Sequence, residues 1–407
     1  MTRVGGYIER CARIMLTTYL RVLRIPGVMG LFVLGLLASL PLGMAGLALF
    51  LNTHERTGSI ATAGLVSAAF VLGNAIGIAV QGRLMDRLGH ARVLLPASIV
   101  SCLALLVAGV LTSQAALLPM ALLAGMAYPA TISSVRVLST ALVIDAGSRI
   151  AAYALLAVSF GLVMVAGPLL VSGIVAVAGP ATAVIVSAAV IGVGGVGFAA
   201  TQAVRNHRPP ARGMDRRRAG ITAGLLTLFA ADIALGFAAG ARGVSLPAAA
   251  IAQGVPLLAG VGFAAMSVGD LVGGLAYGAI RWRATRSRQL IVSLVLTAVA
   301  AWFAVPASGV VPALFLTLLV SGLLGASVGI CMSSLLDDVT PAQSLTSAYT
   351  SMVSLGLVAS AAGDAAAGAV AERLGPSGGF GLAAIAACLA VVSTWRMRRA
   401  LSAGTQR

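Results

Sequence analysis

Twelve runs of apolar residues, separated by short polar stretches, occupy most of this sequence. Their lengths match the roughly 20 residues that a helix needs to cross the hydrocarbon core of a bilayer. Hydrophobic residues make up 59% of the 407 residues and charged residues only 9%, too little polar material to coat a soluble protein. The sequence therefore predicts an all-α integral membrane protein and excludes a β-barrel, whose strands alternate in short segments. The twelve expected spans are residues 28–51, 60–82, 93–112, 115–136, 150–173, 181–203, 220–244, 256–280, 289–306, 311–335, 346–370 and 377–395.

All 27 basic residues are arginines, and most of them gather in alternate loops. They precede the first expected span, follow the second, sixth and eighth spans, and close the chain. The opposite loops hold little beyond Glu55, Arg56, Glu372 and Arg373. Cytoplasmic loops of membrane proteins carry such an excess of Lys and Arg. We therefore expect a multi-pass protein of the cytoplasmic (inner) membrane with both termini in the cytoplasm. The net charge of +16 then reflects topology and contact with membrane lipid, and no nucleic acid is expected as a partner.

Neither a metal site nor a cofactor is expected from the residue pattern. The four cysteines lie far apart without a CxxC pair, and the three histidines fall near helix ends or in loops. The GxGxxG pattern at residues 192–197 lies inside an expected span, where small residues let helices approach closely, and not between a strand and a soluble helix. The spans contain no HExxH pattern, and the chain has no Walker A sequence. An enzyme is therefore not expected.

The two halves of the chain repeat each other at an offset of 196 residues. Gly73 recurs as Gly269, Gly77 as Gly273, Tyr153 as Tyr349, and Gly179-Pro180 as Gly375-Pro376. We therefore expect two six-helix bundles, residues 1–203 and 220–407, joined by a basic cytoplasmic linker at residues 204–219. Because six is an even number, both bundles keep the same orientation in the membrane, which makes a parallel repeat.

The loop after the second span, GRLMDRLGHARVLL (residues 82–95), resembles the signature of the major facilitator superfamily. That signature reads G-x-L-x-D-R-x-G-R-[KR]-x-x-L. The chain supplies its residues at Gly82, Leu84, Asp86, Arg87, Gly89 and Leu94. It departs from the signature at His90 and Ala91, where the family has two basic residues. The resemblance, together with twelve spans and a basic central loop, implies a secondary transporter that works by alternating access, usually as a monomer.

In this family the acid of the loop engages the other half of the protein and an arginine at the foot of the fourth helix. This contact forms when the transporter faces outward. The resemblance therefore implies a conformational latch made by Gly82, Asp86, Arg87, Gly89 and Arg136. The alternative is ordinary positive charge on a cytoplasmic loop. It would explain the arginines but neither the acid nor the spacing of the glycines.

Four ionisable residues lie inside expected spans, where a charge is expensive and marks a candidate functional site: Asp232, Asp270, Asp364 and Arg242. An aspartate in a low-dielectric environment can bind and release a proton as its access to water alternates. We expect at least one of Asp232 and Asp270 to couple transport to protons, with Asp364 as a weaker candidate. The alternative is a purely structural pair, such as Arg242 with Asp364, in which each charge neutralises the other.

The fifth span contains Gly167-Pro168, which resembles the Gly-Pro motif of exporters in this family, although the outer glycines are spaced differently. The substrate cavity has few expected polar anchors, namely Asn74, Gln81, Arg242 and Gln253. The sequence thus favours proton-coupled efflux of a small organic molecule, such as a drug, sugar or metabolite. An importer or facilitator of a similar solute is the first alternative. A transport-dead membrane sensor or a membrane enzyme is the second.

Overall fold

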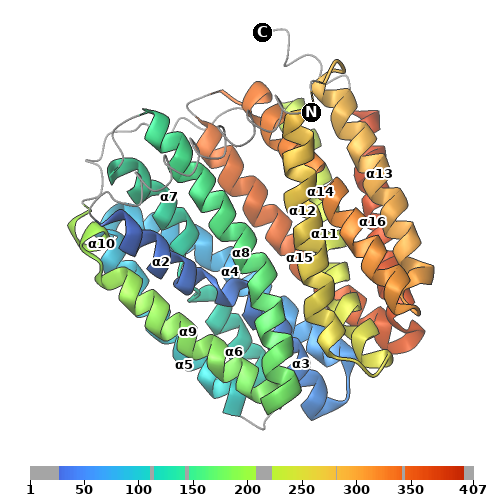
Figure 1. Cartoon of the computed structure of the whole chain (residues 1–407), viewed down its shortest axis with the longest axis horizontal. Coiled ribbons are helices and arrows are strands. Elements are labelled where there is room, and N and C mark those ends of the chain that lie inside the picture. The colour runs from blue at the N-terminus through green and yellow to red at the C-terminus, as the bar shows by residue number, and fades with distance from the viewer. Residues whose placement is uncertain are drawn as a thin grey trace, which may run out of the picture.

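The structure, a computed structural model, describes residues 27–110, 114–142, 146–207, 222–280, 282–341 and 344–397. Within these residues, twelve helical segments are long and apolar enough to cross a membrane, which confirms the predicted all-α membrane fold (Figure 1). The helices are α2 (Val28–Ser39), α3 (Pro41–Thr57), α4 (Ile60–Leu88), α5 (His90–Val110), α6 (Gln114–Met126), α7 (Thr131–Leu142), α8 (Ala146–Ala178), α9 (Pro180–Ala200), α10 (Gln202–Asn206), α11 (Ala223–Ala252), α12 (Leu257–Ala279), α13 (Arg286–Ala307), α14 (Val311–Val339), α15 (Leu345–Leu374) and α16 (Pro376–Arg396). Residues 208–221 lie outside the described part, so the linker at 204–219 stays a prediction.

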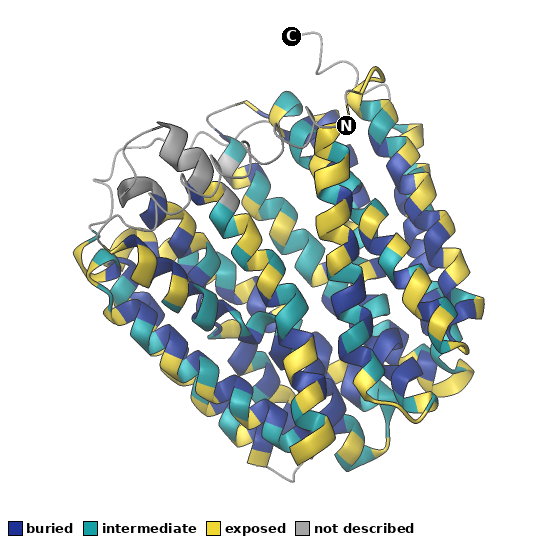
Figure 2. Cartoon of the chain, in the orientation of Figure 1, coloured by how far each residue is buried: buried dark blue, intermediate teal, exposed yellow. Residues whose placement is uncertain are grey.

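Large apolar side chains cover the outside of the bundle (Figure 2). Val193 and Leu275 are each 69% exposed and Phe303 is 65% exposed. A soluble protein rarely exposes an apolar surface that extends so far. The arrangement therefore fits lipid as the surrounding solvent, as the composition predicts.

The first and fourth spans are each broken into two helices, which the length of the apolar runs does not reveal. The first span changes from α2 to α3 at Leu40, immediately before Pro41. The fourth span is interrupted between α6 and α7, where Pro129 lies. Proline has no backbone N–H, and its ring blocks the carbonyl group four residues earlier in a helix. Both breaks therefore leave backbone groups that need partners from elsewhere in the protein.

The two breaks are joined to each other and to α4 by side-chain hydrogen bonds. Tyr128, in the break of the fourth span, donates to the carbonyl oxygens of Ala38 and Ser39, at 3.2 and 3.1 Å. Gln81 of α4 donates to the carbonyl oxygens of Met126, at 3.1 Å, and Tyr128, at 2.8 Å. Its own carbonyl oxygen accepts from the N–H of Ala130 at 3.1 Å. The first, second and fourth spans are thus fixed relative to one another where the two breaks lie.

The repeat seen in the sequence corresponds to a repeat in helix packing. A Cβ atom at Gly73 of α4 would clash with the backbone carbonyl of Leu122 in α6. A Cβ atom at Gly269 of α12 would clash in the same way with Leu319 in α14. Small residues let helices approach closely in a membrane. The matched glycines therefore set the same close helix pair in each half.

The helices before and after residues 208–221 meet along two helix pairs, α4 with α15 and α8 with α12. We call the end of the bundle with the turns at Gly58, Gly179, Gly254 and Gly375 the narrow end. The opposite end, with the turn at Gly89 and with α10, is called the wide end. Figure 1 shows that the two sets of helices lie close together at the narrow end and diverge toward the wide end.

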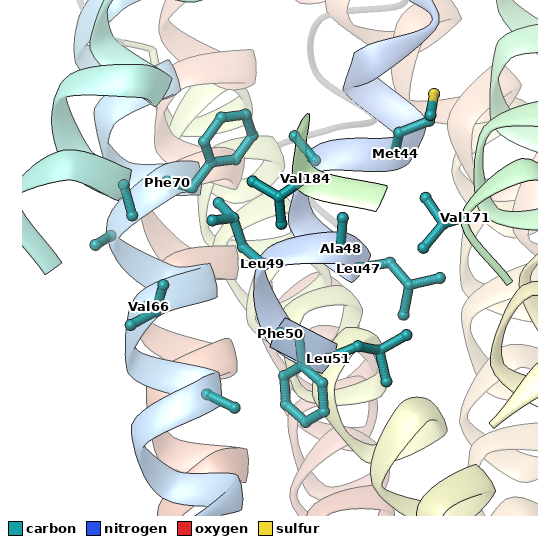
Figure 3. Packing of buried hydrophobic residues seen from close by; sticks show 14 of the residues in the cluster. Met44, Leu47, Ala48, Leu49, Phe50, Leu51, Val66, Phe70, Val171 and Val184 are labelled. Atoms are coloured by element: carbon teal, nitrogen blue, oxygen red, sulfur yellow. The ribbon is translucent and has the colours of Figure 1, made fainter. Parts of the chain in front are cut away.

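A buried apolar cluster around α3 lies toward the narrow end (Figure 3). Phe50 and Leu49 of α3 are 1% and 0% exposed, and Val66 and Phe70 of α4 pack beside them. The same cluster contains residues of both α11 and α15, among them Ala241 and Ala367. The core therefore ties helices of both halves together near the narrow end.

Candidate functional site

The four ionisable residues predicted inside spans all lie on helices that qualify as membrane-spanning. Asp232 and Arg242 belong to α11, Asp270 to α12 and Asp364 to α15. Within the described residues, no three His, Cys, Asp or Glu side chains come together as metal ligands would. The candidate site is thus a set of separate charges, and the surroundings of each decide what it can do.

Arg242 connects α11 with α14 and α12. Its Nη1 donates to the hydroxyl oxygen of Ser321 at 2.7 Å. Its Nε is buried without a hydrogen-bond partner among the described residues. The carboxyl group of Asp270 lies close enough for the two charges to interact. The structure therefore places Arg242 within electrostatic reach of Asp270, whereas the pairing considered from the sequence was with Asp364.

The carboxyl group of Asp270 also approaches α14. A Cβ atom at Gly325 would lie 3.1 Å from its Oδ1, so the glycine leaves room for the carboxyl group. Asp270 is exposed, while Arg242 is half-buried with its Nε atom fully buried. Asp270 is therefore accessible at the surface of α12, and its charge acts on Arg242.

Asp232 lies where α11 crosses α15. A Cβ atom at Gly356 of α15 would lie 2.8 Å from its Oδ2. That oxygen is buried and has no hydrogen-bond partner among the described residues. A buried charge without a partner is costly, so Asp232 stays a candidate functional residue.

Asp364 lies in the contact between α4 and α15, and its side chain is 4% exposed. The hydroxyl group of Ser67 in α4 hydrogen-bonds to its carboxyl group. A Cβ atom at Gly64 would lie 2.9 Å from the carbonyl oxygen of Asp364 and 3.0 Å from Gly368. Asp364 thus joins the two halves toward the narrow end, with no room for a larger residue beside it.

Glu372 makes a second contact between the halves that the sequence analysis treated only as loop charge. Its Oε2 accepts from the backbone N–H of Ile60 at 2.6 Å and of Ala61 at 3.1 Å. These groups begin α4, and a carboxylate there is favoured by the unpaired N–H groups and by the helix dipole. The preference of helix starts for acids is visible in a sequence. A partner more than 300 residues away is not, which is why the contact was missed.

The expected polar anchors of the cavity differ in what they contact. Gln81 is fully engaged with the backbone at the break of the fourth span. Gln253 follows the end of α11 and donates to the carbonyl oxygen of Ser308 at 2.8 Å. Asn74 is 5% exposed, and its Oδ1 has no partner among the described residues. Of these three, Asn74 is the one with a buried polar atom that has no partner among the described residues.

The residues expected to form the latch lie at the wide end. Gly89 has a φ of 87°, and its N–H bonds to the carbonyl oxygen of Met85, so the glycine allows the sharp end of α4. Asp86 and Arg87 are exposed in the last turn of this helix. The guanidinium carbon of Arg136 lies 5.6 Å from the centre of the Tyr153 ring in α8. Arg136 is also within electrostatic reach of Tyr349 in α15, so it lies near the other half.

Gly82, the first residue of the latch, shows no close packing. A Cβ atom there would meet nothing within 4 Å. The pairing of Asp86 with Arg136 stays a prediction for another conformation of the protein.

Comparison with known families decides the class of this protein. A sequence model of the Major Facilitator Superfamily matches residues 31–260, more than half of the chain. The chain belongs to the Major Facilitator Superfamily. It is therefore a transporter with a multi-pass membrane fold, as the resemblance in the loop at residues 82–95 implied. No curated protein sequence matches the chain.

Solved structures of this superfamily share the fold. The nucleoside transporter NupG superposes with a TM-score of 0.69 at 16% identity, over 92% of this chain and 99% of that chain. The human organic anion transporter MFSD10 (TETRAN) superposes with a TM-score of 0.63 at 19% identity, over 91% of this chain and 99% of that chain. At such identities the likeness concerns the fold alone.

The Gly-Pro pair of α8, which resembles the exporter motif of this superfamily, lies at two helix contacts. A Cβ atom at Gly167 would lie 2.8 Å from the backbone of Gly43 in α3. The next residue, Pro168, presents its carbonyl oxygen to Gly260 of α12, so closely that a Cβ atom there would clash. The outer glycines, Gly161 and Gly173, have open space around them. Gly167 thus lets α8 pack closely on α3, Pro168 packs on α12 of the other half, and the outer glycines make no such close contact.

Proposed function

We propose that the protein is a secondary active transporter that exports a small organic molecule across the cytoplasmic membrane in exchange for protons. The observation that carries the proposal is that Asp270 lies within electrostatic reach of Arg242, which donates to Ser321. A buried guanidinium needs a negative or polar partner. When Asp270 takes up a proton, Arg242 loses that partner and becomes available to a polar group of the substrate. The protonation state of Asp270 then controls whether substrate can bind to Arg242, and such a link between proton and substrate is what exchange requires.

The proposal assigns the present conformation to a transporter closed at the outer side. The described arginines outside the spans gather at the wide end, as in Arg87, Arg205, Arg288 and Arg396, and Arg56 and Arg373 are at the narrow end. By the positive-inside rule the wide end faces the cytoplasm. The contacts of Asp364 and Glu372 then close the outer side, and both termini extend into the cytoplasm.

The alternating cycle is proposed to open the narrow end and to form the latch at the wide end. In the open state Asp364 separates from Ser67 and meets water, so it becomes a second place for a proton. Interactions that are made in one state and broken in the other set the balance between two states. Asp86 and Arg136 would form such an interaction when the wide end closes. Each protein molecule carries both halves of the site, which fits a monomer.

An importer or facilitator is the second candidate. The observation that favours it is the open space around Gly161 and Gly173, which departs from the close packing expected of the exporter motif. The two structural neighbours are named as transporters of nucleosides and organic anions. These two solute classes are therefore the first to test as substrates in either direction.

Transport in proteoliposomes with an imposed proton gradient tests the proposal. Labelled nucleosides and organic anions are offered to the parent and to Asp270→Asn and Asp232→Asn. At least one variant is expected to lose accumulation against the gradient while it still exchanges substrate downhill. Glu55→Gln, which changes an exposed acid at the end of α3, serves as the matched control and should transport like the parent. Proton coupling through these residues is wrong if both variants concentrate substrate as the parent does.

A further inference from the structure

A cavity of about 230 Å³ lies between α12, α13 and α14 at the wide end. Its floor is α14, with Leu323 and Leu324, and its walls are α12 and α13, with Ile280 and Val292. Both wall helices pack against α14 but make little contact with each other. The cavity therefore has the form of a groove with α14 at its base.

The groove opens on the outer surface of the bundle, where lipid is expected. Ile280 and Val292 are 52% and 51% exposed, and Leu296 farther along α13 is 45% exposed. The outward faces of α12 and α13 are largely exposed in Figure 2. A hydrocarbon chain from the surrounding bilayer can thus enter the groove from the side without passing through the protein.

The end of the groove toward the loop between α12 and α13 is polar and basic. Arg288, in the first turn of α13, lines it together with Gln289 and Trp282. The Trp282 ring lies 4.8 Å from that of Tyr277, and its Nε1 donates to the Tyr277 carbonyl oxygen at 3.1 Å. Trp is the residue that membrane proteins place at the level of lipid headgroups. The depth of the polar end therefore suits a headgroup.

The charges around this end favour an anion. None of the described residues that line the cavity is acidic. Asp338 of α14 binds Arg286, with 2.6 Å between its Oδ1 and the Nη1 of the arginine. Arg288 lines the groove and supplies a positive charge to it.

We propose that this groove binds an anionic glycerophospholipid, with the phosphate at Arg288 and an acyl chain along α14. Apolar walls open to the bilayer and a basic group at headgroup depth match the two parts of such a lipid. A zwitterionic lipid offers the same chain but a headgroup whose added positive charge Arg288 disfavours. The site lies outside the bundle, so it depends on neither the direction of transport nor its coupling to protons.

Tryptophan quenching by brominated lipids tests the site in the full-length protein. The chain has three tryptophans. The Trp302→Phe and Trp395→Phe variants combined leave Trp282, which is 46% exposed at the groove. The protein is placed in phosphatidylcholine vesicles that contain rising fractions of brominated phosphatidylglycerol or brominated phosphatidylcholine. One arginine near an anionic headgroup is worth about a fivefold preference, so half-quenching should need about fivefold less brominated phosphatidylglycerol. Arg288→Gln should remove this preference, and Arg288→Lys should keep most of it.

Two matched controls separate a site from general attraction to the surface. A second variant keeps only Trp302, which is 49% exposed toward the far end of α13 and does not line the groove, and it should show no preference between the lipids. Arg396→Gln removes a basic residue from the same end and should leave the Trp282 preference unchanged. The proposal is overturned if Trp282 is quenched equally by both lipids, or if Trp302 shows the same preference. It is also overturned if millimolar inorganic phosphate abolishes the preference, which would indicate a site for soluble anions.

Discussion

Asp232, Asp270 and Asp364 carry the same carboxyl group into three different surroundings. Asp270 lies beside the guanidinium of Arg242, and one oxygen of Asp232 has no hydrogen-bond partner among the described residues. Asp364 bonds to Ser67 across the contact between the halves. A carboxyl group responds to burial, neighbouring charges and hydrogen bonds in different ways. At the scale of the residue, removing the charge is therefore expected to have a different effect at each of these three positions.

The charges of Arg242 and Asp270 should be coupled in stability measurements. Asp270→Asn leaves the arginine with Ser321 alone, so it should lower the melting temperature of the purified protein. The double variant Arg242→Gln with Asp270→Asn removes both charges and should recover part of the loss. Coupling energies between interacting residues are roughly 0.5–3 kcal/mol. Thermal unfolding in detergent measures this coupling.

The ion pair of Arg286 with Asp338 is the control for this measurement. Its side chains are 54% and 25% exposed, and surface pairs contribute about 0–1 kcal/mol. Arg286→Gln and Asp338→Asn should therefore change the melting temperature little, alone or together. Simple addition of the effects of Arg242→Gln and Asp270→Asn would contradict an interaction between those two residues.

At the scale of the helix, the breaks in the first and fourth spans are the main departure from the sequence-based expectation. Twelve spans could be predicted because apolar length alone is enough to identify a transmembrane helix. Breaks could not be predicted from proline alone. Pro96 and Pro247 lie inside continuous helices, whereas Pro41 and Pro129 lie where helices change or stop. The difference lies in partners such as Tyr128 and Gln81, which are distant in sequence from most of the groups they satisfy.

Gln81→Leu should lower the free energy of unfolding of the protein. It removes hydrogen bonds to Met126, Tyr128 and Ala130 and leaves backbone groups without partners in an apolar setting. The expected loss is roughly 1–3 kcal/mol of unfolding free energy. Gln253→Leu, which loses one bond to the carbonyl oxygen of Ser308, should cost less in the same thermal unfolding experiment. Equal losses would mean that the break is held by other contacts.

The latch at the end of α4 can be tested by a double-mutant cycle. If Asp86 and Arg136 share one interaction in the outward-facing state, Asp86→Asn and Arg136→Gln should each slow transport to a similar degree. The double variant should then be little worse than either single variant, with a coupling of roughly 0.5–3 kcal/mol. Arg83→Gln, which changes a charge outside the fixed positions of the motif, should matter little. If the effects of the two substitutions simply add, the charges of the loop serve only to orient the protein in the membrane.

The candidate site was predictable in its members but not in its contacts. Asp270 and Arg242 were visible as charges inside apolar runs, and the cost of such charges made them candidates. Their proximity depends on how α11 and α12 cross α14, which no spacing along the chain reveals. The contact of Glu372 with the start of α4 was missed for the same reason. Contacts between helices, unlike the helices themselves, are set by packing.

At the scale of the whole molecule, the two halves are held together by contacts toward one end. Gly260 donates its N–H to the hydroxyl oxygen of Ser172 at 2.9 Å, and the Asp364 and Glu372 contacts lie along the other helix pair. A buried core cluster also crosses between the halves near this end. The balance between the two states of the transporter is therefore expected to depend on these few groups.

Glu372→Gln should shift the protein toward the state in which the narrow end is open. The variant removes a negative charge from the start of α4, which is worth about 0.3–1 kcal/mol, or about two- to fivefold in the ratio of states. Ser172→Cys, at a position 1% exposed in the seam, reports on this opening in a protein without its native cysteines. Labelling by an impermeant thiol reagent added outside cells should speed up by that factor. Glu55→Gln should leave the labelling rate unchanged. An equal effect of both variants would contradict a role for the contact between Glu372 and the start of α4.

The break between α2 and α3 also bears on how the chain is made. Its carbonyl groups at Ala38 and Ser39 receive their bonds from Tyr128, which is synthesised about 90 residues later. Lipid offers no hydrogen bonds, so these groups need another partner until the fourth span has emerged from the ribosome and entered the membrane. We therefore expect α2 and α3 to remain in contact with water or with the insertion channel until the break of the fourth span packs against them. A nascent chain that ends before Tyr128 should be handed to quality-control proteases, and one that ends after α7 should escape them.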